Sequence, residues 1–329
     1  EINHEMPDYF SEKFVDLFGR PRKKNELITK KHYEIASAMQ QVTEDILLHM
    51  CDKLYKITKK NNLVLSGGSI MNSVFNGKVL KKSKFENLFI SSSPDDSGLS
   101  IGACLALYNN ILGSKKRNTQ NHNYYGPEFT NNEIKKTLDG YKIKCDYIKD
   151  IEKYTAKKIE EGNLIGWFQG RMEFGQRALG NRSILADPRN KEMKKIINKA
   201  IKFREGFRPF APAILSDQSK YYFEIKSNEK VPFMEKVLII KKNKRKYIPA
   251  VTHQDGSGRL QTVNKEDNKK FYSLINEFYK LTKIPILLNT SFNVNNEPIV
   301  CTPTDALRNF NSCGLDILVL GNYVITKKN

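Results

Sequence analysis

The segment 170–182 (GRMEFGQRALGNR) contains three arginines, one glutamate and three glycines. Arginine side chains bind phosphate or carboxylate through paired hydrogen bonds, and glycines let the backbone approach a ligand closely. A solvated basic loop is the alternative, but the interleaved Phe174, Ala178 and Leu179 indicate packing. Because burying several guanidinium groups without an anion is costly, the segment predicts an anion site.

The segment 202–212 (KFREGFRPFAP) alternates cations with aromatic and proline residues. Its Lys202, Arg204 and Arg208 suit a small anion. The same interleaving of basic and aromatic side chains also suits the stacking of nucleic-acid bases. Both interpretations stay open from this segment alone.

Polar residues follow the apolar run 285–288, in the order NTSFN over 289–293. Polar side chains at the exit of a strand commonly line ligand sites in α/β proteins. The segment 252–259 (THQDGSGR) contains His253, which suits a general base or a ligand. A lone histidine in a loop more often has neither role.

In the first third of the chain, Gly67 and Gly68 end the apolar run 63–65. They predict either a tight turn or a nucleotide-binding turn, since paired glycines admit a ligand and a following helix start offers free N–H groups to an anion. Asp95 and Asp96 precede another expected helix. Carboxylates there cap the helix or bind a metal beside phosphates, and the spacing alone favours the cap.

Alternating helices and strands must position these segments. Apolar residues at three- and four-residue steps predict a long helix from Ile35 to Leu54, after an irregular lead over residues 1–31. Strands are expected at 63–65 and 87–91, and the helix expected at 98–112 is apolar almost all round, which predicts burial. The polar stretch 113–128 predicts a linker, with a domain boundary near Tyr124.

The second half repeats this alternation, which predicts an α/β fold class. Helices are expected at 131–138, 151–161 and 191–202, and another begins after the N-cap Thr302 and stops at Gly314. Strands are expected at 142–148, 164–168 and 285–288. The runs 317–320 and 323–326 predict a hairpin on a Gly-Asn turn.

The composition excludes several classes of protein. Of the 329 residues 39% are hydrophobic, which suffices for packed cores and excludes wholesale disorder. No apolar run approaches the roughly 18 residues of a membrane span. The five cysteines form no C-x-x-C pair, so reduced thiols in the cytoplasm are expected. The net charge of +19 invites a nucleic-acid partner, but the arginines among glycines and aromatics favour small phosphates.

Six segments together resemble the carbamoyltransferases that modify hydroxyl groups of antibiotics and nodulation factors. The matching strings, in the family's order over about residues 30–329, are LVLSGGSIMNSVFNGK, SSSPDDSGLSIGACL, GWFQGRMEFGQRALGNRSILADPRN, KFREGFRPFAPAIL, AVTHQDGSGRLQTV and LLNTSFNVNNEPIV. The resemblance implies an O-carbamoyltransferase of mixed α/β class with two modules. Residues 1–120 would be the C-terminal half of a Kae1-like domain of the ASKHA ATPase fold, and residues 121–329 a YrdC-like domain.

The resemblance also implies substrates and residue roles. The YrdC-like module would turn carbamoyl phosphate and ATP with Mg²⁺ into carbamoyl-adenylate, and the Kae1-like module would pass the carbamoyl group to a hydroxyl of a small-molecule acceptor beside a divalent metal, Fe²⁺. Residues matched to carbamoyl phosphate and ATP are Arg171, Arg177, Lys202, Arg204, Arg208, Arg259, Asn289 and Ser291, with Arg177, Lys202 and Arg208 as the catalytic ones. Gly67, Gly68 and Asn72 match the Kae1-like nucleotide loop, and Asp96 matches a metal ligand, which shifts its interpretation away from a cap.

The sequence departs from the family in one respect. The Kae1-like domain should supply two histidines spaced H-x-x-x-H, and none of the five histidines of this sequence forms such a pair. The metal site is therefore expected to be incomplete, with the rest supplied by a missing N-terminal segment, as the start at Glu1 suggests, or by a partner chain. Formation of carbamoyl-adenylate would survive this loss and carbamoyl transfer would not.

Two other functions remain as alternatives. One is an enzyme of the tRNA threonylcarbamoylation type, which uses the same two folds, and the other is a non-catalytic nucleotide- or RNA-binding module. The order of the two modules and the segment 170–182 favour the carbamoyltransferase.

Overall fold

The structure is a computed structural model that describes residues 10–23, 26–117, 119–226 and 229–327. The chain divides into two compact units, residues 1–59 and residues 60–329. The first unit contains α1 (Glu12–Phe18) and α2 (Lys30–Thr58). The expected long helix is confirmed as α2, whose N-terminus is closed by a reciprocal capping box between Thr29 and His32. The expectation of an irregular lead was wrong at α1, and residues 1–9 lie outside the described residues.

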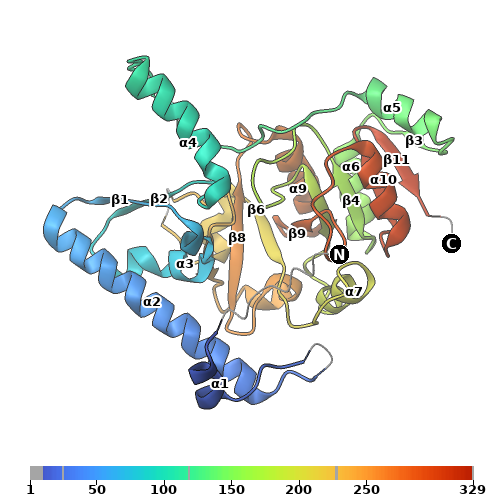
Figure 1. The fold of residues 1–329 in the computed structure, drawn as a ribbon. Coiled ribbons are helices and arrows are strands. Elements are labelled where there is room, and N and C mark those ends of the chain that lie inside the picture. Colours follow the sequence, from blue (N-terminus) through green and yellow to red (C-terminus); the bar gives the residue numbers. More distant parts are fainter. Residues whose placement is uncertain (1–9, 24–25, 118, 227–228, 328–329) are drawn as a thin grey trace, which may run out of the picture. The chain divides into compact units, whose positions relative to one another are not determined.

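The second unit begins with a small region, residues 60–112, which we call the two-stranded region. Its elements are β1 (Asn62–Leu65), the 3-10 turn η1 (Gly68–Met71), α3 (Ser73–Lys82), β2 (Asn87–Ile90), the 3-10 turn η2 (Asp96–Gly98), α4 (Leu99–Ala106) and the π-helical turn η3 (Leu107–Ile111). Strands β1 and β2 pair in parallel (Figure 1). The helix expected at 98–112 forms as α4 and η3, but its expected burial was wrong, because no residue of either element is buried.

Residues 121–327 form a larger region around one mixed sheet, which we call the nine-stranded region. The strand order is β3-β11-β10-β4-β5-β9-β6-β8-β7. The pairs β10–β4 and β6–β8 are parallel and the remaining pairs are antiparallel. The strands are β3 (Asp146–Tyr147), β4 (Ile165–Phe168), β5 (Arg182–Ala186), β6 (Ala211–Leu215), β7 (Lys236–Ile239), β8 (Ser257–Val263), β9 (Ile286–Ser291), β10 (Ile317–Leu320) and β11 (Tyr323–Thr326).

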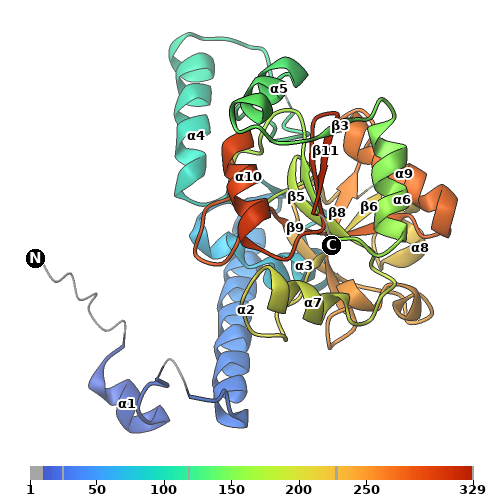
Figure 2. The ribbon, with the colours of Figure 1, turned by 90° about the vertical axis from the view of Figure 1, so that its right-hand side faces the viewer.

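Helices cover both faces of this sheet, and strands β4, β6 and β10 contain no polar or charged side chain except that of Trp167, as is usual for strands buried on both faces. Helices α6 and α9 pack together on one face, and α5 and α10 lie on the other (Figure 2). The helices are α5 (Asn131–Gly140), α6 (Ile151–Glu160), α7 (Met193–Ala200), α8 (Ser219–Tyr222), α9 (Lys269–Thr282) and α10 (Pro303–Ser312), with 3-10 turns η4 (Ser216–Gln218), η5 (Arg245–Tyr247) and η6 (Pro249–Val251). Every residue of β4, β5, β6 and β10 is buried.

Several local predictions for this region are confirmed. Thr302 caps α10 and exchanges hydrogen bonds with Asp305 in a capping box. Strands β10 and β11 form the expected hairpin around Gly321 and Asn322. The mixed α/β class is therefore confirmed, and the assignment to Kae1-like and YrdC-like folds stays a prediction. The boundary near Tyr124, between residues 1–120 and 121–329, also stays a prediction.

The two-stranded region is fastened to the nine-stranded region at the edge strand β7. Helix α3 lies against β7 so closely that a Cβ on Gly77 would stand 1.9 Å from the carbonyl oxygen of Val237. The Asn76 side chain donates to the backbone carbonyls of Ile70 and Glu235 at 2.7 and 2.9 Å. Only a glycine permits this approach of a helix to a strand.

Within the described part of the chain, no helix combines the length and the apolarity that crossing a lipid bilayer requires.

Candidate functional site

Six of the predicted anion-binding residues line one cavity of about 420 Å³ in the nine-stranded region. They are Arg177, Arg204, Arg208, Arg259, Asn289 and Ser291. His253 lines the same cavity, and Ser73 and Val74 at the start of α3 contribute to its wall. We call this cavity the arginine pocket.

The sheet topology explains how distant segments meet there. Strand β9 runs antiparallel to β6, so Asn289 near the end of β9 lies opposite Ala211 at the start of β6. Strand β8 runs parallel to β6 and carries Arg259 near its own start. The segment 202–210 leads into β6, and Arg177 comes from the loop between β4 and β5. Residues from four parts of the sequence therefore lie together at one end of these strands.

The arginine pocket carries an excess of positive charge. No aspartate or glutamate is among the described residues that line it. Arg208 makes an ion pair with Glu205 at 2.9 Å, Arg259 donates to the Met234 carbonyl at 2.7 Å, and no hydrogen bond or ion pair of Arg177 occurs within the described residues. Burial lowers the pKa of Arg177, and burial together with the charge of Arg177 lowers the pKa of Arg259 to about 9. A bound anion would relieve both costs.

Lys202 does not line the arginine pocket, although it contacts Ser291, which does. Its side chain is buried, and its Nζ lies 2.7–3.2 Å from four oxygens, two each from Ser291 and Asn293. The Ser291 hydroxyl donates to Asn293 Oδ1 at 2.6 Å. Burial lowers the pKa of Lys202 to about 7, and the neighbouring Arg204 acts in the same direction. Lys202 thus holds the end of β9 in place, with its donors already engaged.

The three arginines of the segment 170–182 have three different environments. Only Arg177 lines the arginine pocket. Arg182 is fully buried, donates to the carbonyls of Pro127, Gln169, Gly170 and Asn181, and stacks on the Phe168 ring at 3.6 Å. Arg171 is exposed and lies 3.6 Å from Glu128, outside the pocket. The expectation that the segment acts as one anion site therefore needs correction, because Arg182 serves the fold.

The loop that carries Arg177 is closed by a buried carboxylate. Glu173 Oε1 accepts from the backbone N–H groups of Leu179 and Asn181 at 2.6 and 2.8 Å. Burial raises the pKa of Glu173 although these hydrogen bonds oppose the rise. Gly180 has a φ of +110°, and a Cβ there would meet the Phe271 ring at 2.2 Å. The loop therefore has one tightly determined path, which fixes Arg177 at the pocket.

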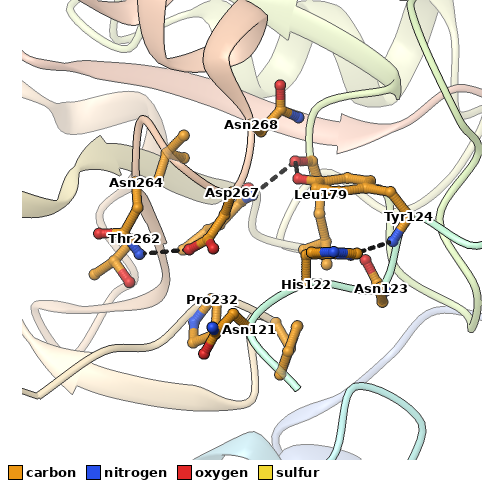
Figure 3. A pocket seen from close by; sticks show the side chains of 13 residues that line it. Asn121, His122, Asn123, Tyr124, Leu179, Pro232, Thr262, Asn264, Asp267 and Asn268 are labelled. Carbon is orange, nitrogen blue, oxygen red and sulfur yellow. Dashed lines mark hydrogen bonds between the residues drawn. The ribbon is translucent and has the colours of Figure 1, made fainter. Parts of the chain in front are cut away.

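Tyr124, in the segment 113–128 expected to be a linker, packs against the loop that carries Arg177. Figure 3 shows Tyr124 beside Leu179, with Asn264, Asp267 and Asn268 around a small cavity of about 10 Å³. The Tyr124 hydroxyl donates to the Leu179 carbonyl at 3.0 Å, and Gln261 donates to the same carbonyl at 2.8 Å. This cavity holds no more than a water molecule. It belongs to the scaffold of the arginine pocket.

Gly67, Gly68 and Asp96 lie together at the ends of β1 and β2. The Gly67 N–H donates to the Pro94 carbonyl at 2.6 Å, which places the two loops side by side. A Cβ on either glycine would meet nothing within 4 Å, so the turn is open. Asn72 caps α3 by accepting from Phe75 N–H. Asp96 is exposed, and neither it nor Asp95 caps α4, since no side chain accepts at that helix start.

These residues do not make a metal site in this chain. Across the described residues, no three side chains of His, Cys, Asp or Glu come together as a group that could hold a metal ion. His253 lies in the arginine pocket, and His122 stacks on Tyr124 with ring centroids 5.7 Å apart. The described residues alone therefore do not supply a complete set of ligands for the expected Fe²⁺, which stays a prediction.

Sequence reasoning did not select Asn293 and Gln261 as site residues. Asn293 holds both Lys202 and Ser291, and Gln261 holds Asn289 through a hydrogen bond of 2.8 Å. A signal for Gln261 exists, since residues two apart on a strand share one face of the sheet and Gln261 is two residues after Arg259 on β8. Asn293 lies beyond the end of β9, so this periodicity does not indicate it.

Two family models match this chain. "Carbamoyltransferase C-terminus" matches residues 156–327, and "Carbamoyltransferase N-terminus" matches residues 3–105. The first range contains the whole arginine pocket except for Ser73 and Val74. The predicted boundary near Tyr124 lies between the two ranges.

Curated relatives agree with these matches. Nodulation protein NolNO of Sinorhizobium fredii is 40% identical and nodulation protein NolO of Bradyrhizobium diazoefficiens is 38% identical, each over 93% of this chain and over 46% and 57% of the relative. Nodulation protein U of Azorhizobium caulinodans is 32% identical over 87% of this chain and 48% of its own. The chain thus spans about half the length of the relatives that it matches.

A solved structure, full-length HypF in a phosphate- and nucleotide-bound form, aligns with 54% of this chain and 22% of its own at 17% identity and a TM-score of 0.38. A TM-score this low does not establish a shared fold. Two family models and the relatives at 32–40% identity do establish membership. This chain belongs to the carbamoyltransferase family.

Proposed function

We propose that the arginine pocket binds carbamoyl phosphate and ATP and forms carbamoyl-adenylate. The observation that carries this proposal is the set of four arginines around one cavity of about 420 Å³ without a lining carboxylate. Two phosphorylated substrates bring enough negative charge to compensate these cations. A cavity of a few hundred Å³ also matches the usual size of small-molecule sites.

The proposed reaction determines where negative charge develops in the arginine pocket. Carbamoyl phosphate, water and ATP give carbamoyl-adenylate, inorganic phosphate and pyrophosphate. Water first hydrolyses carbamoyl phosphate to carbamate and inorganic phosphate. In the adenylation step an oxygen of this carbamate bonds to the α-phosphorus of ATP, and the bond from that phosphorus to the pyrophosphate oxygen breaks. Negative charge builds on the departing pyrophosphate. Arg177 and Arg259, which are partly buried, would stabilise that charge together with Arg204 and Arg208, which line the same cavity. ATP would enter with Mg²⁺ on its phosphates, as ATP usually does in proteins.

In this proposal Lys202 is a positioning residue. Its Nζ contacts two oxygens of Ser291 and two of Asn293, so it fixes the end of β9 and with it one wall of the pocket. Asn289 is held by Gln261 and by the Ala178 carbonyl. The polar wall is therefore preformed before substrate arrives, which lowers the cost of ordering it.

The transfer of the carbamoyl group is a further proposal, because this chain spans about half the length of the relatives that it matches. We propose that the full-length enzyme passes the carbamoyl group to a hydroxyl of a small-molecule acceptor, as the family to which this chain belongs implies. The open turn at Gly67 and Gly68, with Asn72 behind it, is the proposed second nucleotide contact. The polypeptide that completes this region would supply the remaining acceptor contacts.

Release of pyrophosphate from ATP that depends on carbamoyl phosphate tests the proposal. We expect the unmodified chain to release it and Arg177→Ala to lose at least about 100-fold in rate, the usual scale for removing a charge-stabilising donor. Arg171→Ala is the matched control, because it removes an arginine from the same loop outside the pocket. A well-folded chain that releases no pyrophosphate, or equal rates in both variants, would contradict the proposal.

A further inference from the structure

Within the described residues, three hydrogen-bond acceptors on residues that line the arginine pocket have no donor. They are Nε2 of His253, Oδ1 of Asn289 and Oε1 of Gln176, all buried from solvent. Other hydrogen bonds fix His253 and Asn289, whereas the described residues make none to the Gln176 amide, so only the first two acceptors have a fixed identity. Buried polar atoms without a partner are costly, and native proteins keep few of them. A phosphate bound by the arginines would not satisfy these atoms, because its oxygens are acceptors and have no hydrogen to donate.

The hydrogen bonds of His253 determine which of its nitrogens is the acceptor. The Ser257 hydroxyl donates to the carboxylate of Asp255 at 2.6 Å, and hydrogen bonds from Ser257 lower the pKa of Asp255 although burial opposes this. A carboxylate only accepts, so Ser257 Oγ must accept from Nδ1 of His253, 3.0 Å away. The Nε2 atom, on the other side of the ring, is then unprotonated while the imidazole is neutral. Burial lowers the pKa of His253, which keeps the ring neutral.

The orientation of the Asn289 amide is fixed by a similar chain of hydrogen bonds. Gln261 Nε2 donates to the Leu179 carbonyl at 2.8 Å, so Gln261 Oε1 is the atom that faces Asn289. Asn289 Nδ2 donates to that oxygen at 2.8 Å and to the Ala178 carbonyl at 3.2 Å. If the oxygen and nitrogen of the Asn289 amide were exchanged, its oxygen would face two other acceptors, Gln261 Oε1 and the Ala178 carbonyl. Asn289 Oδ1 is therefore the atom left without a donor.

We infer that His253 and Asn289 select ligands whose acyl group carries N–H donors, so that the pocket prefers carbamoyl phosphate to acyl phosphates that lack an amine. This inference rests on the proposed function and names how that site would recognise its substrate. The arginines bind the phosphoryl group, and the two acceptors receive hydrogen bonds from the carbamoyl –NH₂. Acetyl phosphate has a methyl group in place of this amine and leaves both acceptors unpaired.

The alternative is that water satisfies both acceptors, whatever ligand is bound. An ordered water can bridge polar groups at small cost in a pocket of this size. The two explanations differ in one measurable quantity, the ratio of affinities for carbamoyl phosphate and acetyl phosphate. Selection by the protein makes this ratio depend on His253, and bridging water does not.

The experiment is calorimetric titration of carbamoyl phosphate, acetyl phosphate and inorganic phosphate into the whole chain. We expect carbamoyl phosphate to bind at least about tenfold more tightly than acetyl phosphate, from two hydrogen bonds of ordinary strength. His253→Phe keeps an aromatic ring and removes the acceptor, so the ratio should fall about three- to tenfold through weaker binding of carbamoyl phosphate alone. Ser257→Ala releases Nδ1 without changing the pocket wall and should lower the ratio less.

The outcomes separate this inference from the proposed function. Equal affinities for the two acyl phosphates, with binding lost in Arg177→Ala, would leave the anion site standing and overturn the selection by His253 and Asn289. An unchanged ratio in both His253→Phe and Ser257→Ala would also overturn it. If the unmodified chain binds none of the three ligands, the proposed function falls and the inference with it. Should His253→Phe fail to fold, Ser257→Ala still decides.

Discussion

The two-stranded region and the nine-stranded region contain the same kinds of elements and differ in how much of their apolar surface is covered. Strands β4, β5, β6 and β10 of the larger sheet are buried along their whole length. In the smaller region Val64 on β1 is 68% exposed and Leu99 on α4 is 71% exposed. Parallel strands are normally covered on both faces, and two strands alone are marginal.

The predicted site residues follow the same division. In the nine-stranded region long-range strand pairing brings six of them to one cavity. In the two-stranded region Gly67 and Asp96 share a sheet end, and among the described residues no group of His, Cys, Asp or Glu side chains that could hold a metal ion forms there. The comparison teaches that the proposed activation of carbamoyl phosphate is best tested in the nine-stranded region, where the predicted anion-binding residues meet.

The largest effect should come from Arg182, which the sequence does not distinguish from Arg177. Arg182→Ala removes a donor from four backbone carbonyls, of which those of Pro127 and Asn181 keep a backbone N–H donor, and it leaves a cavity where a fully buried side chain stacked on Phe168. We therefore expect the free energy of unfolding to fall by about 3 kcal/mol or more. Arg177→Ala should change it by no more than about 0.5 kcal/mol. Urea denaturation measures both, and similar losses would break the distinction between the two arginines.

The contact between the two regions can be tested at Gly77. A Cβ at this position would overlap the Val237 carbonyl, so Gly77→Ala must push α3 away from β7 and should cost about 1–3 kcal/mol. Gly68→Ala is the matched control, because a Cβ there meets nothing within 4 Å. Thermal unfolding of the two variants decides. A Gly77→Ala protein as stable as the control would mean that α3 is not seated on β7.

The burial of Lys202 in the nine-stranded region predicts that the free energy of unfolding depends on pH. Its pKa is lowered to about 7 in the folded chain from an ordinary 10.5, so between these values the unfolded chain binds more protons. Stability should therefore rise with pH across this window, by up to about 1.4 kcal/mol per pH unit. Denaturation at pH 7 and pH 9 measures the slope. A slope that is identical in Lys202→Met would contradict this assignment.

The smallest effect is expected on α4. Leu105 is 51% exposed, so Leu105→Gln should change the free energy of unfolding by no more than about 0.5 kcal/mol. Leu318→Ala in β10, which is fully buried, should cost about 2–5 kcal/mol. Chemical denaturation compares the two. If Leu105→Gln costs as much as Leu318→Ala, α4 is packed within this chain and the contrast between the regions fails.

Much of the fold could be predicted from the sequence because its signals are local. The apolar spacing of α2, the capping box at Thr302 and the turn at Gly321 each depend on neighbouring residues. The burial of α4 could not be predicted in this way. Its apolar composition favours packing against another element, but the sequence of the helix does not identify that element.

The candidate site also contains features that local sequence signals predict and features that depend on distant parts of the chain. The strand-exit pattern indicated the segment of Asn289 and Ser291, the family resemblance indicated Arg259, and all three residues line one cavity. The role of Arg182 depends on four carbonyls between residues 127 and 181, and that of Lys202 on a loop some 90 positions later in the chain. Sequence types show that such cations need partners, and only the fold identifies the partners.

The most direct test is a crystal structure of this chain with carbamoyl phosphate and a non-hydrolysable ATP analogue. We predict phosphoryl groups bound among Arg177, Arg204, Arg208 and Arg259, with the carbamoyl nitrogen toward His253 and Asn289. Phosphoryl groups found only at the turn of Gly67 and Gly68, with the arginine pocket empty, would contradict the account.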